Sequence, residues 1–461
     1  MNLSLDVLTA TTPPPKNLLG NETSGCLFMA LRPLITICGT TGVGKSKLAI
    51  ELALALSQNL GHRDHGYQGA RIINADAMQV YAGMDIITNK VPVAEQSGIE
   101  HLLMGFKQPG EQYIVTQWVQ DAMQAIDDTH RRNQVPIVVG GTSYWIQHLV
   151  FPNRLVSMGE NTANGKHTRG ATVPCGKLTA SLASLPRELA DLFATLPEKA
   201  PSATMNPELA LSLHSLLSAL DPHIAERWHW KDTRKVLRNL IILKDTGRLP
   251  SEIFFDQSQL DVQPRYQTLC FWLYANPDIL KPRLDARVDQ MVQQGLLDEI
   301  RTLKDARPST PDPLIGGQSD LVDSDLEDHA DYTLGIYQSI GYKEFHQYLS
   351  HPGHSEEIFL DALQNMKAAT RKYAKRQIMW IRNKLLPAID SVKVSCKSNN
   401  TSPVAIAYLL DATEPSTWES SVRGPAQSIT QNFLEGKELM NPIELSDTAR
   451  EILGRVRQSK K

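Results

Sequence analysis

The sequence predicts an α/β fold, with a P-loop NTPase-like parallel sheet flanked by helices and a mainly helical insertion. Three observations support this prediction. Short, continuously apolar runs alternate with segments of helical periodicity, the pattern of strands that are buried on both faces of a parallel sheet. A glycine-rich loop separates the first apolar run from the first helix. Residues 152–206, rich in Gly, Ser, Thr, Ala and Pro, then interrupt the alternation.

The elements follow in chain order. The expected strands are Leu34–Cys38, a short run at Ile72–Ile73, Val135–Val139 and Thr268–Tyr274. The main expected helices are residues 45–60, 116–131, 207–247, 285–303 and 332–385. We therefore assign the P-loop catalytic core to residues 32–151 and about 265–387, and an insertion to about 152–264. Ligands of parallel sheets bind at the carboxyl ends of the strands, so we expect the glycine loop, Asp76 and Thr142 to face one crevice.

Three further segments differ in composition from this core. Residues 1–31 have neither the apolar stretch of a secretory signal nor the arginines of a transit peptide, so we expect a disordered leader. Residues 306–331 are rich in proline, glycine and acids, which is typical of a mobile loop. Beyond residue 387 the sequence is polar, and we expect a C-terminal tail (388–461) with one or two short helices.

Composition excludes several classes of protein. The 461 residues suggest two to three domains or one domain with large insertions, and the contents of 41% hydrophobic and 21% charged residues are typical of a globular protein. No apolar run reaches the roughly 20 residues that span a membrane. The formal net charge of −3 means that a nucleic acid would have to meet a local basic patch. The five cysteines form no C-x-x-C pair, which favours a reducing compartment.

The segment Gly39-Thr40-Thr41-Gly42-Val43-Gly44-Lys45-Ser46 matches the P-loop pattern G-x-x-x-x-G-K-[ST] between a strand and a helix. Backbone N–H groups of such a loop point at anionic oxygens. Lys45 adds a mobile cation, and the hydroxyl of Ser46 suits a Mg²⁺ ligand. The loop is therefore predicted to bind a polyphosphate or a diphosphate, and a turn that binds no ligand is the alternative.

Asp76 is the acid that a strand end presents to this loop. The longest candidate strand, Val135–Val139, ends in glycines and lacks the carboxylate that NTPases place there. A single carboxylate without an evident partner to position water suits a general base acting on an acceptor. A helix N-cap or a metal ligand remains the alternative for Asp76.

Two basic segments could meet an anionic partner. Residues 367–384 contain seven lysines and arginines, among them Arg371, and no acid, so this helix could contact an RNA backbone or close over a diphosphate. Arg234, Lys235 and Arg238 form a weaker second patch. For both segments a solvated basic face is the alternative.

Several motifs together resemble the tRNA dimethylallyltransferase family. They occur in the family's order: Gly39–Ser46, Asn74–Tyr81, Met84–Lys90, Val139–Tyr144, Thr246–Glu252, Ser339–Phe345 and Thr370–Gln377. The resemblance covers roughly residues 33–385 and is strongest to the eukaryotic branch. A P-loop alone is widespread, whereas its combination with D-x-x-Q-V-Y, V-G-G-T and T-R-x-x-A-K-R-Q is highly specific.

The resemblance implies transfer of a dimethylallyl group from dimethylallyl diphosphate to N6 of adenosine 37 in tRNA, with release of diphosphate. The donor would lie on the P-loop with Mg²⁺. Thr41 matches a donor-contacting threonine, Arg371 the arginine that neutralises the leaving diphosphate, and Asp76 the carboxylate that takes the N6 proton. The positions that match tRNA contacts are Asp76, Ala77, Met78, Gln79, Thr142, Arg234, Lys235, Val236, Leu237 and Arg238.

Three positions depart from the family pattern. Cys396 is the only cysteine after Cys270 and no histidine follows His354, so these residues cannot form the C-terminal C₂H₂ zinc finger common in eukaryotic members. Asn239–Ile241 replaces Ala-Leu-Glu, and Glu100-His101 replaces a His-His pair. The first departure bears on the affinity for tRNA, and the other two bear on details of the crevice.

Three other functions stay open at this point: a P-loop small-molecule kinase, an enzyme that prenylates free adenine nucleotides, and a non-enzymatic RNA-binding scaffold. For the leading hypothesis we expect a monomer that acts on the anticodon stem-loop of tRNA without a membrane partner. We expect it in the cytoplasm, with mitochondria or the nucleus as further compartments.

Overall fold

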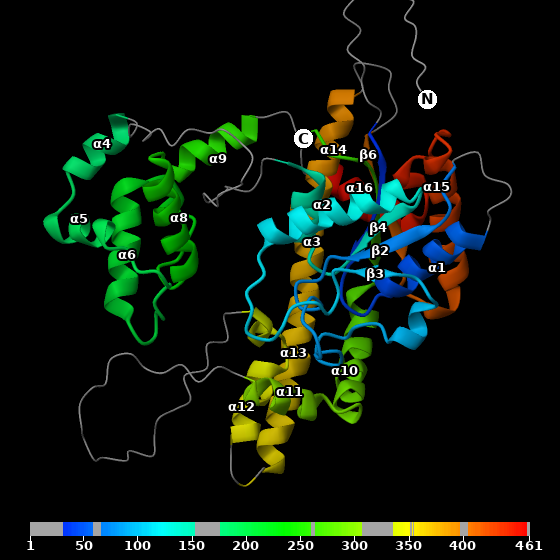
Figure 1. The fold of residues 1–461 in the computed structure, drawn as a ribbon, viewed down its shortest axis with the longest axis horizontal. Helices are drawn as coiled ribbons and strands as arrows, with labels where there is room; N and C mark the ends of the chain where they lie inside the picture. Colours follow the sequence, from blue (N-terminus) through cyan, green and yellow to red (C-terminus); the bar gives the residue numbers. More distant parts are fainter. Residues whose placement is uncertain are drawn as a thin grey trace, which may run out of the picture. The chain divides into compact units, whose positions relative to one another are not determined.

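Six parallel strands form one sheet in the order β3-β2-β4-β1-β5-β6 (Figure 1). They are β1 (Pro33–Gly39), β2 (Ala70–Asn74), β3 (His101–Leu102), β4 (Val135–Val139), β5 (Gln267–Tyr274) and β6 (Ala405–Asp411). This computed structural model describes residues 31–58, 66–152, 176–259, 263–306, 335–350, 353, 355–396 and 404–458. The parallel sheet flanked by helices confirms the predicted fold class.

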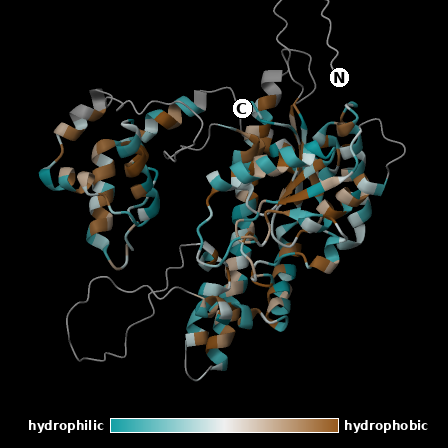
Figure 2. Cartoon of the chain, viewed as in Figure 1, coloured by the Kyte–Doolittle hydropathy of each residue, from teal (hydrophilic) through white to brown (hydrophobic). Residues whose placement is uncertain are grey.

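Both faces of the sheet are buried, and successive strand residues serve opposite faces. In β1, Ile35 and Ile37 belong to one apolar core while Leu34 and Cys38 belong to the other. Hydrophobic residues therefore run along the strands between the covering helices (Figure 2). This arrangement explains why the strands have continuous apolar runs in the sequence rather than alternating ones.

Helices supply the rest of the two cores. The core containing Ile35 receives side chains from α1 (Lys45–Gln58) and α15 (Gly424–Leu434). The core containing Leu34 receives them from α2 (Val115–Arg131), α3 (Ser143–Val150), α14 (Leu386–Cys396) and α16 (Asp447–Gln458). Two helices contribute to both cores, α10 (Pro277–Gln293) and α13 (Glu356–Trp380).

The helix predicted at residues 285–303 is in fact two helices. After α10 the chain turns at Gly295, whose φ of 102° lies in the left-handed region, and α11 (Leu296–Asp305) begins there. The shorter elements of the core are α12 (Tyr342–Ser350), the 3-10 helices η1 (Val93–Gln96), η2 (Gly335–Gln338), η4 (Pro415–Thr417) and η6 (Pro442–Glu444), and the π-helices η3 (Ile381–Leu385) and η5 (Glu419–Arg423).

The described part of the insertion is helical and has a hydrophobic core of its own. Its helices are α4 (Gly176–Ala183), α5 (Arg187–Ala194), α6 (Pro207–Leu220), α7 (Pro222–Ala225), α8 (Thr233–Thr246) and α9 (Pro250–Gln259). Asp221 is buried here, with its carboxylate accepting from the N–H of Ile224 at 3.4 Å and of Ser251 at 2.8 Å. One carboxylate therefore caps α7 and ties it to the first turn of α9.

The prediction of a polar tail over residues 388–461 was wrong. Residues 405–411 form β6, which pairs with β5 from Thr268↔Ala405 to Tyr274↔Asp411. Leu409 and Leu410 in this strand are fully buried. The apolar run at 405–410 carries the same signal as the other strands, but the polar residues around it dilute the average composition of the segment.

Two other predicted segments, the leader (1–31) except for Leu31 and most of the acidic loop (306–331), lie outside the described residues. In the part of the chain that is described, no helix is both long and apolar enough to cross a membrane.

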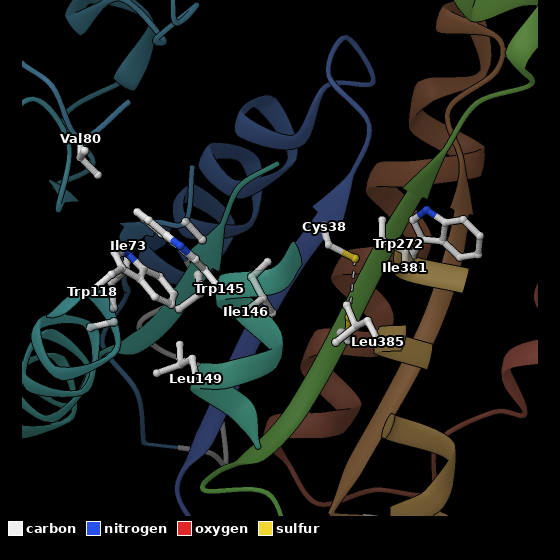
Figure 3. Close-up of a cluster of buried hydrophobic side chains, with 14 of the residues drawn as sticks. Cys38, Ile73, Val80, Trp118, Trp145, Ile146, Leu149, Trp272, Ile381 and Leu385 are labelled. Carbon is white, nitrogen blue, oxygen red and sulfur yellow. Dashed lines mark hydrogen bonds between the residues drawn. The ribbon is translucent and has the colours of Figure 1, made fainter. Parts of the chain in front are cut away.

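Two cysteines, Cys38 and Cys270, lie next to each other in the apolar core beside β1. The sulfurs of Cys38 and Cys270 are 3.9 Å apart across β1 and β5, both buried and free (Figure 3). Trp118 and Trp145 stack nearby with ring centroids 5.0 Å apart (Figure 3). The indole N–H of Trp118 donates to the carbonyl of Asn74 at 2.9 Å, which fixes the end of β2.

The burial of β6 leads to a first prediction. Leu409→Ala should lower the free energy of unfolding by about 2–5 kcal/mol, because it leaves a cavity in a buried strand. Ser428→Ala, at an exposed position of α15 in the same segment, should change it by less than about 0.5 kcal/mol. Equilibrium denaturation measures both, and equal stability of the two variants would contradict the integration of β6.

Candidate functional site

The glycine loop has the predicted setting, because β1 ends at Gly39 and α1 begins at Lys45. Gly44, with φ of 89°, adopts the left-handed conformation that turns the loop into the helix. The first turn of α1 therefore presents backbone N–H groups at the loop, which is the arrangement that binds anions.

Lys45 lies in this loop as a partly buried cation. Its Nζ donates to the carbonyl oxygen of Thr40 at 2.7 Å. Burial lowers the pKa of Lys45 to about 8, while the carboxylate of Asp76 raises it and the charge of Arg287 lowers it further. Because these charges act on the ammonium group, Asp76 and the P-loop face one site, as the sequence predicted.

Asp76 is held by hydrogen bonds between the ends of β2 and β4. Its Oδ1 accepts from the N–H of Met78 at 3.0 Å, and Thr142 Oγ1 accepts from the N–H of Ala77 at 3.0 Å. A Cβ built on Gly141 would lie 3.0 Å from Asp76 Oδ2. Asp76 thus caps a turn through one oxygen, and its other oxygen lies against a glycine. No helix begins at this turn, so the alternative of a helix N-cap does not describe Asp76.

Helix α13 joins the glycine loop to this carboxylate. The amide of Gln377 accepts from the N–H of Thr41 at 2.9 Å and donates to the carbonyl of Gly141 at 2.9 Å. One turn earlier, the phenol of Tyr373 approaches Gly141, and burial together with the charge of Asp76 raises its pKa. Both residues lie at helical spacing on the face of α13 that packs against the core, so their spacing in the sequence indicates packing alone.

Arg287 is a second cation at the loop that sequence reasoning missed. Its Nη1 would lie 3.7 Å from a Cβ built on Gly42, and burial lowers its pKa to about 10. Its Nε donates to Asn89 Oδ1 at 2.8 Å, so its side-chain partner is a neutral amide. The available signal was its position between Leu284 and Met291, because these residues form the buried stripe of α10.

A side chain of α11 holds the loop that carries Asn89 in place. Glu299 accepts from the N–H groups of Asp85, Ile86 and Ile87 at 2.8–3.0 Å. Gln79, predicted to contact tRNA, is bound to the same loop, since its Nε2 donates to the carbonyls of Thr88 and Asn89 at 3.1 Å each.

Arg371 has an acidic partner on the neighbouring helix. It lies on α13, where its Nη1 contacts Asp285 Oδ1 at 2.5 Å, and Lys367 pairs with Asp289 at 2.6 Å. The segment read as purely cationic is therefore partly neutralised by α10. Lys372, Lys375 and Arg376 of α13 are exposed.

The residues of α8 that were predicted to contact tRNA fall into two groups, one exposed and one buried. Arg234, Lys235 and Arg238 are exposed on one face of the helix. Val236 and Leu237 are buried in the core of the insertion, so their side chains cannot contact RNA and that part of the prediction was wrong. Helical periodicity already separates positions 234, 235 and 238 from positions 236 and 237.

A family model described as IPP transferase matches residues 79–384. The tRNA dimethylallyltransferase of Schizosaccharomyces pombe is 34% identical over 409 residues, which cover 88% of this chain and 80% of that protein. This chain belongs to the IPP transferase family.

Other relatives in the IPP transferase family carry the same name. Human tRNA dimethylallyltransferase is 32% identical, over 90% of this chain and 77% of that protein. A solved structure of a eukaryotic dimethylallyltransferase acting on tRNA aligns with a TM-score of 0.63 and 31% identity, over 89% of this chain and 81% of that chain. The predicted class of enzyme, a tRNA-modifying prenyltransferase, is confirmed.

The buried ammonium group of Lys45 predicts a dependence of anion binding on pH. With a pKa of about 8 in the free protein, Lys45 loses its proton as the pH rises through 8. An anion favours the charged form, so binding above pH 8 requires uptake of a proton, and affinity for inorganic diphosphate should fall by up to about tenfold per pH unit.

Calorimetric titration at several pH values between 7 and 9.5 measures this fall. Lys45→Met should bind diphosphate weakly and lose the pH dependence above 8. An unchanged dependence in that variant would assign the titration to another group.

Proposed function

We propose that this protein transfers the dimethylallyl group of dimethylallyl diphosphate to N6 of adenosine 37 in tRNA. The position of Asp76 carries the proposal, because a carboxylate lies within electrostatic reach of the lysine of an anion-binding loop. A hydrolase would need a group that positions water, whereas a transferase needs a base for the acceptor and cations for the leaving group.

In the proposed step, N6 of adenosine attacks the allylic carbon that bears the diphosphate. The new N–C bond forms as the C–O bond breaks, and the bonding electrons leave with the diphosphate. The N6 proton passes to Asp76, whose Oδ2 is the oxygen not used to cap Met78. Thr41 contacts the donor, and Lys45 and Arg287 stabilise the charge that develops on the leaving group.

The resemblance implied that Arg371 neutralises the leaving diphosphate. We propose that it does so together with an acidic partner. In the free protein its guanidinium group contacts Asp285, and both side chains are about one-third exposed (33% and 35%). We propose that its remaining N–H groups contact the diphosphate once the donor binds. Asp285 then orients Arg371 rather than cancelling it.

The site fits Mg²⁺ as the expected cofactor. Ser46 lies in the first turn of α1, and no group of three His, Cys, Asp or Glu side chains that could hold a metal occurs among the described residues. Mg²⁺ commonly keeps several waters and is held by few protein ligands together with substrate phosphates. The hydroxyl of Ser46 would therefore hold the ion against the diphosphate, where the ion supplies additional positive charge.

Exposed cations support tRNA as the acceptor. Lys372, Lys375 and Arg376 of α13 lie on the helix that carries Gln377 into the site, and α8 exposes Arg234, Lys235 and Arg238. We propose that both helices contact the RNA backbone, and that residues 76–79 and Thr142 contact adenosine 37. The base must leave the anticodon stack, at a cost of a few kcal/mol.

The proposal also covers the oligomeric state and the compartment of the protein. We propose a monomer in the cytoplasm, with mitochondria or the nucleus as further compartments. A P-loop kinase is disfavoured by family membership, and an enzyme for free adenine nucleotides would not need the helical insertion with its own core.

A transfer assay tests the function. It combines purified protein, anticodon stem-loop RNA with adenosine 37, labelled dimethylallyl diphosphate and Mg²⁺, and we expect label in the RNA. Asp76→Ala should reduce the rate by about 10²–10⁴-fold, because the general base is lost. Label in AMP but not in RNA would change the acceptor, and phosphorylation of a small molecule would change the reaction class.

The two arginines should differ in the same assay. Arg287→Ala removes a buried cation at the loop and should lower kcat by about 10²–10³-fold. Arg371→Ala should lower it by roughly tenfold less, because Arg371 is more exposed and already paired. Asp285→Asn keeps the shape of that pair and should have a small effect. A larger loss from Arg371→Ala than from Arg287→Ala would reverse the assignment.

A further inference from the structure

The segment that follows β6 reaches the glycine loop. Because β6 is parallel to β5, its carboxyl end lies at the same edge of the sheet as the end of β1. From there the chain runs through η4 to Trp418. A Cβ built on Gly44 would lie 2.7 Å and 2.9 Å from two carbons of the Trp418 ring. The indole therefore lies directly against the backbone of the loop.

Three contacts with the start of α1 fix the orientation of this ring. The outer edge of its six-membered ring lies against Gly44, its Nε1 donates to Glu51 Oε2 at 2.8 Å, and Lys47 Nζ lies 4.6 Å from the ring centroid. The cation over the ring adds an electrostatic attraction that helps to hold the indole in place. A π-helix, η5, begins at the next residue, and such irregular turns often occur at functional sites.

The strand order places Trp418 and Asp76 on opposite sides of the loop. β1 lies inside the sheet, with β4 and β2 on one side and β5 and β6 on the other. Asp76 and Gly141 follow β2 and β4, whereas Trp418 follows β6. A diphosphate on the loop can extend its organic group toward either side, and only one side leads to the proposed base.

We propose that Trp418 determines donor specificity by closing the side of the diphosphate site that lies away from Asp76. The indole occupies space that the substituent of a nucleoside diphosphate would need, and it leaves the organic group only the direction toward Asp76. Inorganic diphosphate, which has no substituent, is accepted. A site can reject a competitor by filling the space that the competitor requires. This inference deepens the proposed function and rests on it for the identity of the donor.

A binding experiment separates this role from a general effect on the loop. Inorganic diphosphate and ADP, each with Mg²⁺, are titrated calorimetrically into the wild-type protein and into Trp418→Ala. We expect the wild-type protein to bind diphosphate more tightly than ADP. In Trp418→Ala the affinity for ADP should rise by about tenfold, and that for diphosphate should change by less than about threefold. A parallel change for both ligands, or no gain for ADP, would overturn the proposal.

Two further variants show whether a change in affinity comes from loss of the indole or from a disturbed fold. Trp418→Phe keeps an aromatic ring on Gly44 but is smaller, so it should show the same selective gain at about threefold. Tyr408→Phe in the same segment removes only the hydroxyl that donates to the carbonyl of Met440 at 2.6 Å, and it should leave both affinities unchanged. Because these titrations do not require turnover, failure of prenyl transfer would refute the proposed function without affecting them.

Discussion

The side-chain amide of Gln377 is the contact on which the site depends. It joins the N–H of Thr41 in the glycine loop to the carbonyl of Gly141 after β4, with both hydrogen bonds at 2.9 Å. The glycine loop, the end of β4 beside Asp76 and helix α13 therefore form one unit. A buried amide that satisfies two backbone groups at once is expensive to lose, because its removal leaves both groups without partners.

Two cations of the site are in place before an anion binds. Lys45 and Arg287 are both partly buried, the charge of Arg287 acts on Lys45, and desolvation depresses the pKa of each. Such cations raise the energy of the empty site and are relieved when an anion binds. The protein thus holds positive charge in place before an anion binds, so little reorganisation of the site is needed at that moment.

Local patterns in the sequence predicted those parts of the site that lie at strand ends. The glycine loop, Asp76 and Thr142 follow apolar runs, and the rule for parallel sheets brings such positions together. Gln377, Arg287 and Trp418 could not be found in this way, because none of them follows a strand end and each reaches the loop through a long-range contact. For Arg287, spacing showed only that it lies on the buried stripe of α10. The three exposed and two buried residues in α8 show the opposite case, since helical periodicity alone would have separated them. β6 was missed because averaging over a long segment concealed a six-residue run.

The position of β6 in the chain has a consequence for biosynthesis. Its partner β5 ends at Tyr274, so about 130 residues must be translated before the last strand can pair. At roughly 5–20 residues per second the β5 edge stays open for on the order of ten seconds. An unpaired strand with Leu269 and Phe271 is a template for association with other chains. The nascent chain is therefore most open to such association during the interval before β6 has been translated.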